Sequence, residues 1–297
     1  EHLNKKYQSL ASKLKKAVMN KSEWKAESKV QKIRDKADAK KEGSRPRAYV
    51  IDFKGDLKAS AVQSLREEIS AILDVATEKD QVIIRLENYG GVVHEHGLAA
   101  SQLVRIREHN IPLLVCIDKV AASGGYMMAC IADHLVAAPC ALVGSIGVIA
   151  QLPNFHRLLQ KHDVDYEVLT AGEYKRTLTV FGENTDKGRE KFIEELEDTH
   201  ELFKTFVSEY RPQLDVEKIA TGEVWFGRRA LNEQLIDAIS TSDDYIFELC
   251  QEHDVFELSY EVKLGLQERL GQLAISTSDG LLLRWWQRVT NSRLLSR

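Results

Sequence analysis

One short stretch, VAASGGYMMA at residues 120–129, places a serine and two glycines between apolar runs. The aliphatic and β-branched run at residues 111–118 before it is typical of a strand buried on both faces. Residues 126–132 after it have helical composition. Ser123 is therefore expected where a buried strand turns into a helix, and Gly124 and Gly125 allow a sharp turn there. A hydroxyl so placed lies beside free backbone N–H groups that can hold an oxyanion, although an ordinary helix N-cap would put a serine in the same position.

Three further blocks accompany this stretch: ENYGGVV at 87–93, VGSIGVI at 143–149 and AGEYKR at 171–176. In this order and spacing, the four blocks resemble the signal peptide peptidase A family of serine proteases, in particular its shorter, SohB-type membrane-associated branch. The resemblance extends over about residues 48–242. It implies an α/β fold of the ClpP/crotonase type, a spiral of ββα units, and a serine endopeptidase that needs no metal and no organic cofactor.

The resemblance also implies a role for each candidate residue. Ser123 corresponds to the nucleophile, Lys175 to the general base, and Ser145 to the residue that orients the lysine. A serine hydroxyl is a weak nucleophile, so without a paired histidine it needs another base, and a neutral lysine can provide one. Judged by their neighbours alone, Lys175 is a surface lysine and Ser145 a turn hydroxyl. The implied oxyanion donors are the amides of Gly91 and Gly124.

One departure from the family pattern falls next to these donors. The usual Ser-Pro before the two glycines is Asn88-Tyr89 here. Loss of proline gives a loop more conformational freedom, so we expect a less preformed oxyanion hole. The departure keeps open a non-enzymatic alternative, a scaffold that binds membrane proteins with a decayed site. A second alternative is crotonase-type acyl-CoA chemistry, because that fold shares the glycine-lined oxyanion hole.

Other residues that could bind metals or form disulfides do not have the required spacing. His94 and His96 are two positions apart and do not share a helix face, and no HExxH motif occurs, so we expect two solvent-facing histidines. The four cysteines form no CxxC pair, which predicts neither disulfides nor zinc.

The elements that must position the candidate residues alternate along the chain. Strands are expected at 48–53, 81–86, 111–118, 135–138, within 141–151 and at 166–170, with helices at 59–76 and 95–109. This alternation predicts a parallel sheet covered by helices. An apolar stripe along residues 186–210, on a long charged helix, is expected to pack on the core.

Both ends of the chain differ in character from this protease domain at 48–242. Residues 1–47 carry 15 Lys/Arg and 6 Asp/Glu, and Tyr7, Leu10, Leu14 and Val18 fall at helical spacing. We expect a basic amphipathic helix and a linker, either as a solvated tail or lying against anionic lipid; nucleic-acid binding lacks a recognition motif. Residues 243–297 predict a helix, a strand near 256–262 and a basic tail with Trp285-Trp286, which could lie at a membrane interface or cap a neighbouring subunit.

The expected setting of the protein follows from the resemblance. It implies peptide substrates, such as cleaved signal peptides or membrane-associated chains, and a homo-oligomer whose subunits enclose the active sites. It also implies a bacterial inner membrane with the catalytic domain on the periplasmic side. A lysine-rich segment beside an anchor normally stays cytoplasmic, so the face is left open.

Overall fold

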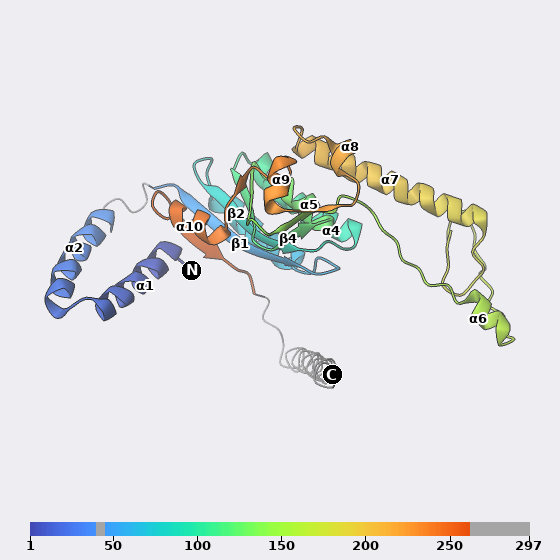
Figure 1. The fold of residues 1–297 in the computed structure, drawn as a ribbon, viewed down its shortest axis with the longest axis horizontal. Coiled ribbons are helices and arrows are strands. Elements are labelled where there is room, and N and C mark those ends of the chain that lie inside the picture. Colours follow the sequence, from blue (N-terminus) through green and yellow to red (C-terminus); the bar gives the residue numbers. More distant parts are fainter. Residues whose placement is uncertain (40–44, 262–297) are drawn as a thin grey trace, which may run out of the picture. The chain divides into compact units, whose positions relative to one another are not determined.

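The computed structural model describes residues 1–39 and 45–261, which form a mixed α/β domain around one curled sheet (Figure 1). Its strands are β1 (Arg47–Gly55), β2 (Gln81–Asn88), β3 (Leu113–Ile117), β4 (Val120–Ala122), β5 (His134–Ala137), β6 (Leu142–Gly144), β7 (Val224–Phe226), β8 (Ala238–Ile239) and β9 (Asp254–Leu258). These strands pair in parallel except for β7, which runs antiparallel to β6. The parallel sheet expected from the sequence is therefore confirmed.

The sheet divides at β2. One edge of β2 pairs with β1, while the other edge pairs with β3 along residues 82–85 and with β4 at Asn88. From there one branch continues through β5 and β8, and the other through β6 and β7. The expected α/β fold is confirmed, and Ser123 directly follows β4, in the second branch.

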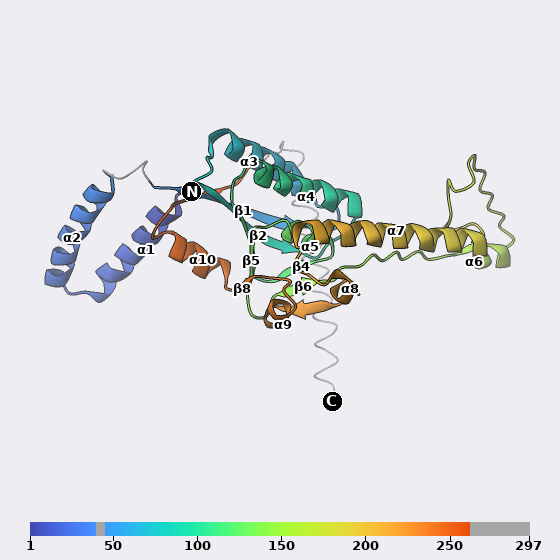
Figure 2. The ribbon, with the colours of Figure 1, turned by 90° about the horizontal axis from the view of Figure 1, so that it is seen from above.

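Helices cover both faces of the sheet (Figure 2). They are α1 (Leu3–Val18), α2 (Lys21–Ala39), α3 (Val62–Val75), α4 (Val93–Glu108), α5 (Gly124–Ala129), α6 (His156–Lys161), α7 (Asp186–Tyr210), α8 (Val216–Ile219), α9 (Gly227–Asn232) and α10 (Ser242–Leu249). Alternate residues of β1 pack on opposite faces: Ile51 joins the core under α3, α4 and α5, and Val50 joins a smaller core with α1 and α10. The buried strands expected from the apolar runs thus have both faces covered.

One expected strand is wrong, and another is shorter than expected. Residues 166–170 are exposed and pair with no strand of the described chain, so their alternating pattern has no sheet to join. The strand expected within 141–151 ends at Gly144, because Ser145 has a φ of 53° and cannot continue an extended backbone. Along α7, the expected core stripe is buried only at Phe203 and Val207.

The basic N-terminal region contains two helices rather than the single helix expected. Between α1 and α2, Asn20 accepts hydrogen bonds from the backbone N–H groups of Ser22 and Glu23, each at 3.0 Å, which starts the second helix. Leu3 is buried at the other end of α1, whereas Leu10 and Leu14 are exposed. The start of α1 therefore packs on the core, through Leu3 and the half-buried Tyr7.

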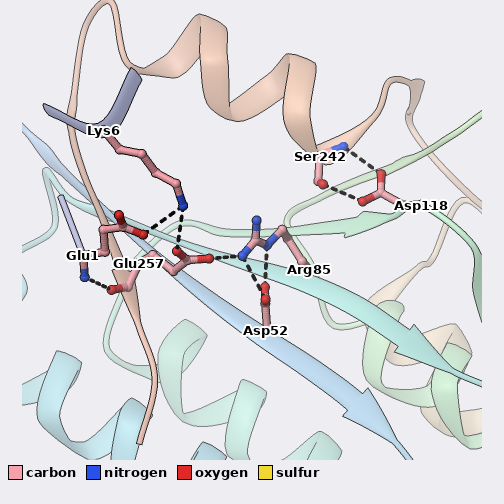
Figure 3. A network of polar contacts seen from close by, with 7 residues as sticks. All are labelled: Glu1, Lys6, Asp52, Arg85, Asp118, Ser242 and Glu257. Carbon is pink, nitrogen blue, oxygen red and sulfur yellow. Dashed lines mark hydrogen bonds and ion pairs between the residues drawn. The ribbon is translucent and has the colours of Figure 1, made fainter. Parts of the chain in front are cut away.

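Polar contacts attach both ends of the described chain to the sheet (Figure 3). The Arg85 guanidinium of β2 donates to Asp52 of β1 and to Glu257 of β9. The N-terminal amino group of Glu1 donates to the Glu257 carbonyl at 2.7 Å. These contacts join β1, β2 and β9 with the start of the chain.

None of the helices among the described residues is long and apolar enough to cross a membrane. The strand expected near 256–262 is β9, and the helix before it is α10. The expected basic tail with Trp285-Trp286 lies outside the described residues.

Candidate active site

Ser123 lies on a strained turn between β4 and α5. Its backbone angles, a φ of 52° and a ψ of −122°, are values that residues with a Cβ rarely adopt. Although Ser123 occupies the N-cap position of α5, its side chain makes no capping hydrogen bond. Its backbone N–H donates to the Gly144 carbonyl at 2.8 Å, which holds the turn against β6. The half-buried hydroxyl therefore has no capping role, and the N-cap alternative does not account for it.

The two glycines after Ser123 permit a close approach of neighbouring backbone and side chains. A Cβ on Gly125 would overlap the carbonyl oxygen of Asn88, and one on Gly124 would lie 2.5 Å from the ring of His96. Any larger residue at either position would push α5 away from β2 and α4. The Ser-Gly-Gly sequence thus fixes the start of α5 against two other elements.

Ser145 takes the corresponding position on the adjacent strand. Register pairs Ala122 of β4 with Gly144 of β6, so Ser123 and Ser145 follow the ends of two neighbouring parallel strands. The φ values of the two serines are 52° and 53°. The backbone N–H of Ser145 donates to the Glu223 carbonyl at 2.6 Å. The structure therefore brings these two predicted site residues together.

A second loop, residues 88–92, lies against the turn at Ser123. Gly90 has a φ of 85°, and a Cβ there would lie 2.7 Å from Ser123 Cβ and 2.9 Å from the Gly124 nitrogen. The N–H of Gly90 donates to Asn88 Oδ1 at 2.8 Å. The N–H of Val92 donates to the Leu57 carbonyl at 2.9 Å. Both amides that flank Gly91 are thus fixed.

The amides of Gly91 and Gly124 differ from these flanking amides. Neither has a hydrogen-bond partner within residues 1–39 and 45–261. Gly124 is the first residue of α5, where helix N–H groups lack intrahelical partners. Two unpaired N–H groups on two touching loops have the character that an oxyanion site requires.

Asn88-Tyr89 does not leave the loop unsupported, contrary to the expectation from the missing proline. Tyr89 points to solvent, with 67% of its surface exposed, while Asn88 is fully buried. The Asn88 side chain fits against Gly55, where a Cβ would lie 2.5 Å from Asn88 Oδ1. Its hydrogen bond to Gly90 restrains the loop in place of a proline ring. The replacement of Ser-Pro by Asn88-Tyr89 therefore no longer favours a scaffold with a decayed site.

His96 is buried, so the expectation of two solvent-facing histidines is wrong for this residue. His94 is exposed, but His96 has no exposed surface and its Nε2 lies 3.2 Å from Asn88 Oδ1. Its position could have been found from helical spacing, because His96 precedes the buried Ala99 and Ala100 by three and four residues. Both histidines lie on α4, and only His96 faces the core.

Lys175 lies apart from this cluster within the single chain. It is exposed, and its Nζ has no hydrogen-bond or ion-pair partner in the described part of the chain. Neighbouring Glu173 pairs with Lys187 in the first turn of α7 at 2.6 Å. Phe203, the first buried residue of α7, lies sixteen positions after Lys187. The rise of an α-helix therefore separates these two residues by about 24 Å along the axis of α7. The single chain does not bring Lys175 to Ser123, and its role stays a prediction.

The described residues hold no group of three or more His, Cys, Asp or Glu that could bind a metal ion. All four cysteines are free thiols. Burial raises the pKa of the Cys116 thiol to about 12, which makes it a poor nucleophile. Among the groups around α5, a strained serine hydroxyl is thus the candidate nucleophile.

Two family models cover most of the chain. The model of the peptidase family S49 N-terminal region matches residues 1–103, and the model of peptidase family S49 matches residues 105–255. The chain belongs to peptidase family S49. It is therefore a protease, and the family expected from the four sequence blocks is confirmed.

Curated relatives of this S49 chain carry protease names. "Probable protease SohB" of Haemophilus influenzae is 58% identical over 237 residues, covering 80% of this chain and 67% of the relative. "Probable protease SohB" of Buchnera aphidicola subsp. Acyrthosiphon pisum is 53% identical over 226 residues, covering 76% and 67%. The expected SohB-type assignment is confirmed.

The solved structures similar to this S49 chain include a membrane-bound stomatin-specific protease in complex with a substrate peptide. It is 13% identical, with a TM-score of 0.47, and the match covers 74% of this chain and 94% of that one. The ClpP protease catalytic domain from Plasmodium falciparum matches with a TM-score of 0.41 and 11% identity, covering 65% and 85%.

Proposed function

We propose that this S49 protease is a serine endopeptidase in which Ser123 is the nucleophile and Lys175 the general base. The observation that carries the proposal is the strained turn at Ser123, with a φ of 52° and an uncapped hydroxyl, which lies against the loop of Gly90 and Gly91. Strain at a residue with a Cβ is retained where function requires it. Ser145, on the adjacent strand end, would orient the lysine.

The reaction uses groups of the protein alone. Ser123 Oγ attacks the carbonyl carbon of the scissile peptide bond, and its proton passes to Lys175 Nζ. The carbonyl oxygen becomes an oxyanion held by the Gly91 and Gly124 amides, each donor being worth about 3 kcal/mol. The C–N bond then breaks, and the amine leaves with the proton from Lys175. Water hydrolyses the ester by the same route, returning Ser123 and Lys175 to their first state.

Because Lys175 is remote from Ser123 along the single chain, we propose that the dyad forms between copies in a homo-oligomer. The segment around Lys175 favours association, because it exposes large apolar side chains. They are Leu152, Phe155, Leu158, Tyr166, Leu169 and Phe181. An enclosed assembly would also exclude water from the lysine, which favours its neutral form.

We propose hydrophobic peptides as substrates, such as cleaved signal peptides or membrane-associated chains, and a location at the bacterial inner membrane with the catalytic domain periplasmic. The N-terminal helices support a membrane location. α1 carries Lys15 and Lys16 in its last turn, and it exposes Leu14 and Val18 at 66% and 72%. A basic helix with exposed apolar residues suits an anionic lipid surface.

Cleavage of a quenched hydrophobic peptide tests the proposal. Ser123→Ala and Lys175→Ala should each be folded and inactive by themselves. Mixing the two variants under conditions that exchange subunits should restore activity, because one copy then supplies the serine and the other the lysine. Activity of Ser123→Ala equal to the parent would exclude this nucleophile, and no recovery on mixing would exclude a dyad shared between copies.

A further inference from the structure

A buried polar pair lies directly beneath the two loops that carry the proposed oxyanion donors. It consists of Asn88 at the end of β2 and His96 in the first turn of α4, neither of which has exposed surface. Nε2 of His96 lies 3.2 Å from Oδ1 of Asn88. A buried polar group lowers the stability of the fold unless it is hydrogen-bonded. The partners of Asn88 and His96 therefore show which segments the pair holds.

The hydrogen bonds around Asn88 fix the orientation of its amide. Oδ1 accepts the Gly90 N–H at 2.8 Å, and Nδ2 faces the sulfur of Met128 at 3.4 Å. His96 Nε2 faces this Oδ1 at 3.2 Å and Nδ1 faces the Val92 carbonyl at 3.0 Å, so a neutral imidazole, which has one N–H, donates to one of these two acceptors. Oδ1 thus accepts the N–H of the loop and is in polar contact with the histidine ring.

His96 connects Asn88 to the turn that carries Gly124. A Cβ on Gly124 would lie 2.5 Å from Cγ of His96, so the imidazole ring packs directly on the residue that provides the second amide. Nδ1 of His96 lies 3.0 Å from the carbonyl of Val92, which places the ring at the end of the first loop. Asn88 therefore fixes the Gly90 side of the site, and His96 spans from that loop to Gly124.

We propose that Asn88 and His96 are positioning residues that hold the Gly91 and Gly124 amides in one geometry before substrate arrives. This inference rests on the proposed function and adds to it the residues that preorganise the oxyanion site. The pair touches neither the substrate nor the nucleophile. It acts through Gly90, which precedes the donor Gly91, and through Gly124, whose own amide is the second donor. Donors fixed in advance stabilise a developing charge most effectively.

The test compares Asn88→Leu, which removes the acceptor at similar size, and His96→Phe, which keeps a ring but no donor. Gln102→Leu is the matched control, because Gln102 is a buried polar residue of the same helix that contacts Leu98 and Arg105 rather than either loop. The probes are a quenched hydrophobic peptide and a peptide aldehyde, whose adduct with Ser123 places an oxygen in the oxyanion site.

Both variants should lower kcat by about tenfold to a hundredfold, less than the loss of a whole donor, with KM within about twofold of the parent. The inhibition constant of the aldehyde should rise by the same factor as kcat/KM falls. The double variant should lose less than the product of the two single losses, because the two side chains also contact each other. His96→Gln, which retains an amide donor, should recover part of kcat, and Gln102→Leu should leave kcat and the aldehyde constant unchanged.

Hydrogen exchange separates this inference from the proposed function. The Gly90 amide should exchange faster in Asn88→Leu and in His96→Phe than in the parent, whether or not peptide is cleaved. If Ser123→Ala abolishes cleavage but both pair variants keep the parental kcat, the positioning role is wrong while the proposed function stands. If the parent is inactive, the proposed function fails, and unchanged Gly90 exchange would then overturn the positioning role as well.

Discussion

Ser123 and Ser145 follow the ends of two paired parallel strands and share the same unusual backbone conformation, with φ values of 52° and 53°. Each is held there by its backbone N–H, Ser123 to the Gly144 carbonyl at 2.8 Å and Ser145 to the Glu223 carbonyl at 2.6 Å. Residues with a Cβ avoid this region because the Cβ clashes with the backbone. Both hydroxyls are thus presented at one edge of the sheet at a cost in stability.

Ser123→Gly should make the protein more stable and inactive at the same time. Glycine relieves the strain of a positive φ but adds backbone entropy to the unfolded chain, so we expect a net gain of about 1 kcal/mol. Such a gain raises the melting temperature of a domain of this size by about 2–4 °C. Calorimetry and the quenched-peptide assay measure the two effects on the same sample.

Ser123→Ala is the control for that experiment, because alanine removes the hydroxyl and keeps the Cβ. It should be as inactive as Ser123→Gly but should melt within about 1 °C of the parent, since the strain remains. Equal melting temperatures for the glycine and alanine variants would show that this backbone conformation carries no strain.

Gly90→Ala should impair both stability and activity. Gly90 has a φ of 85°, and its Cβ would lie within 2.9 Å of Ser123 Cβ, the Ala122 carbonyl and the Gly124 nitrogen. We expect a loss of about 1–3 kcal/mol and a fall in kcat as the two loops separate. Urea unfolding and steady-state kinetics measure these losses.

Gly97→Ala provides a matched comparison from the neighbouring helix. Gly97 lies inside α4, and nothing lies within 4 Å of its Cβ position. Alanine there should stabilise the protein by up to about 1 kcal/mol through helix propensity and leave kcat unchanged. If the two substitutions had the same effect on kcat, the contact between the Gly90 loop and the Ser123 turn would have no role in catalysis.

The sequence predicts the elements that have strong local signals. The apolar runs at 81–86 and 111–118 are strands because both of their faces are covered, and the Ser-Gly-Gly turn is found where a strand run meets a helical one. The run at 166–170 is also expected to be a strand but remains outside the sheet. Local pattern alone cannot show whether a neighbouring strand is available for pairing.

The missed parts of the site depend on contacts between distant segments. The missing proline predicts a loose loop, yet Asn88 restrains this loop by filling the space left by Gly55 and by its hydrogen bond to Gly90. The separation of His96 from His94 argues against a metal site but does not show whether His96 is buried, which its spacing from Ala99 and Ala100 indicates. Periodicity alone would have placed His96 on the buried face, but only the folded structure pairs it with Asn88.

Asn4→Ala should release α1 from the core. The Asn4 side chain donates to the carbonyls of Cys250 and His253, both at 2.9 Å, and accepts the Val255 N–H at 2.8 Å. Loss of this side chain leaves a buried N–H unpaired, at a cost of about 1–3 kcal/mol. Hydrogen exchange should speed up at Val255 and through α1.

Asn20→Ala is the comparison for that release, because Asn20 only caps α2. Its loss should cost about 1 kcal/mol or less, with faster exchange confined to α2. Unchanged exchange at Val255 in Asn4→Ala would mean that burial of Leu3 suffices to hold α1.

Asp237→Asn should destabilise the protein by an amount that depends on pH. Arg211, only 3% exposed at the end of α7, donates to both carboxylate oxygens of Asp237 at 2.8 Å. Burial by itself raises the pKa of Asp237, but the hydrogen bonds from Arg211 and from the Leu135 N–H outweigh it, and the pKa lies below its ordinary value. Removal of one partner of such a pair should cost roughly 3 kcal/mol near neutral pH.

The sign of the pH dependence follows from the lowered pKa of Asp237. The stabilisation is fully present above the unfolded pKa of about 3.9 and is lost as the pH falls from there through the folded pKa. The difference in unfolding free energy between the parent and Asp237→Asn should therefore be constant above about pH 5 and shrink below about pH 4. Glu233→Gln, which removes a partner of the exposed Lys218, should cost less than about 1 kcal/mol over the same range. A difference between the parent and Asp237→Asn that persists undiminished at pH 3 would show that Asp237 acts through packing and neutral hydrogen bonds instead of its charge.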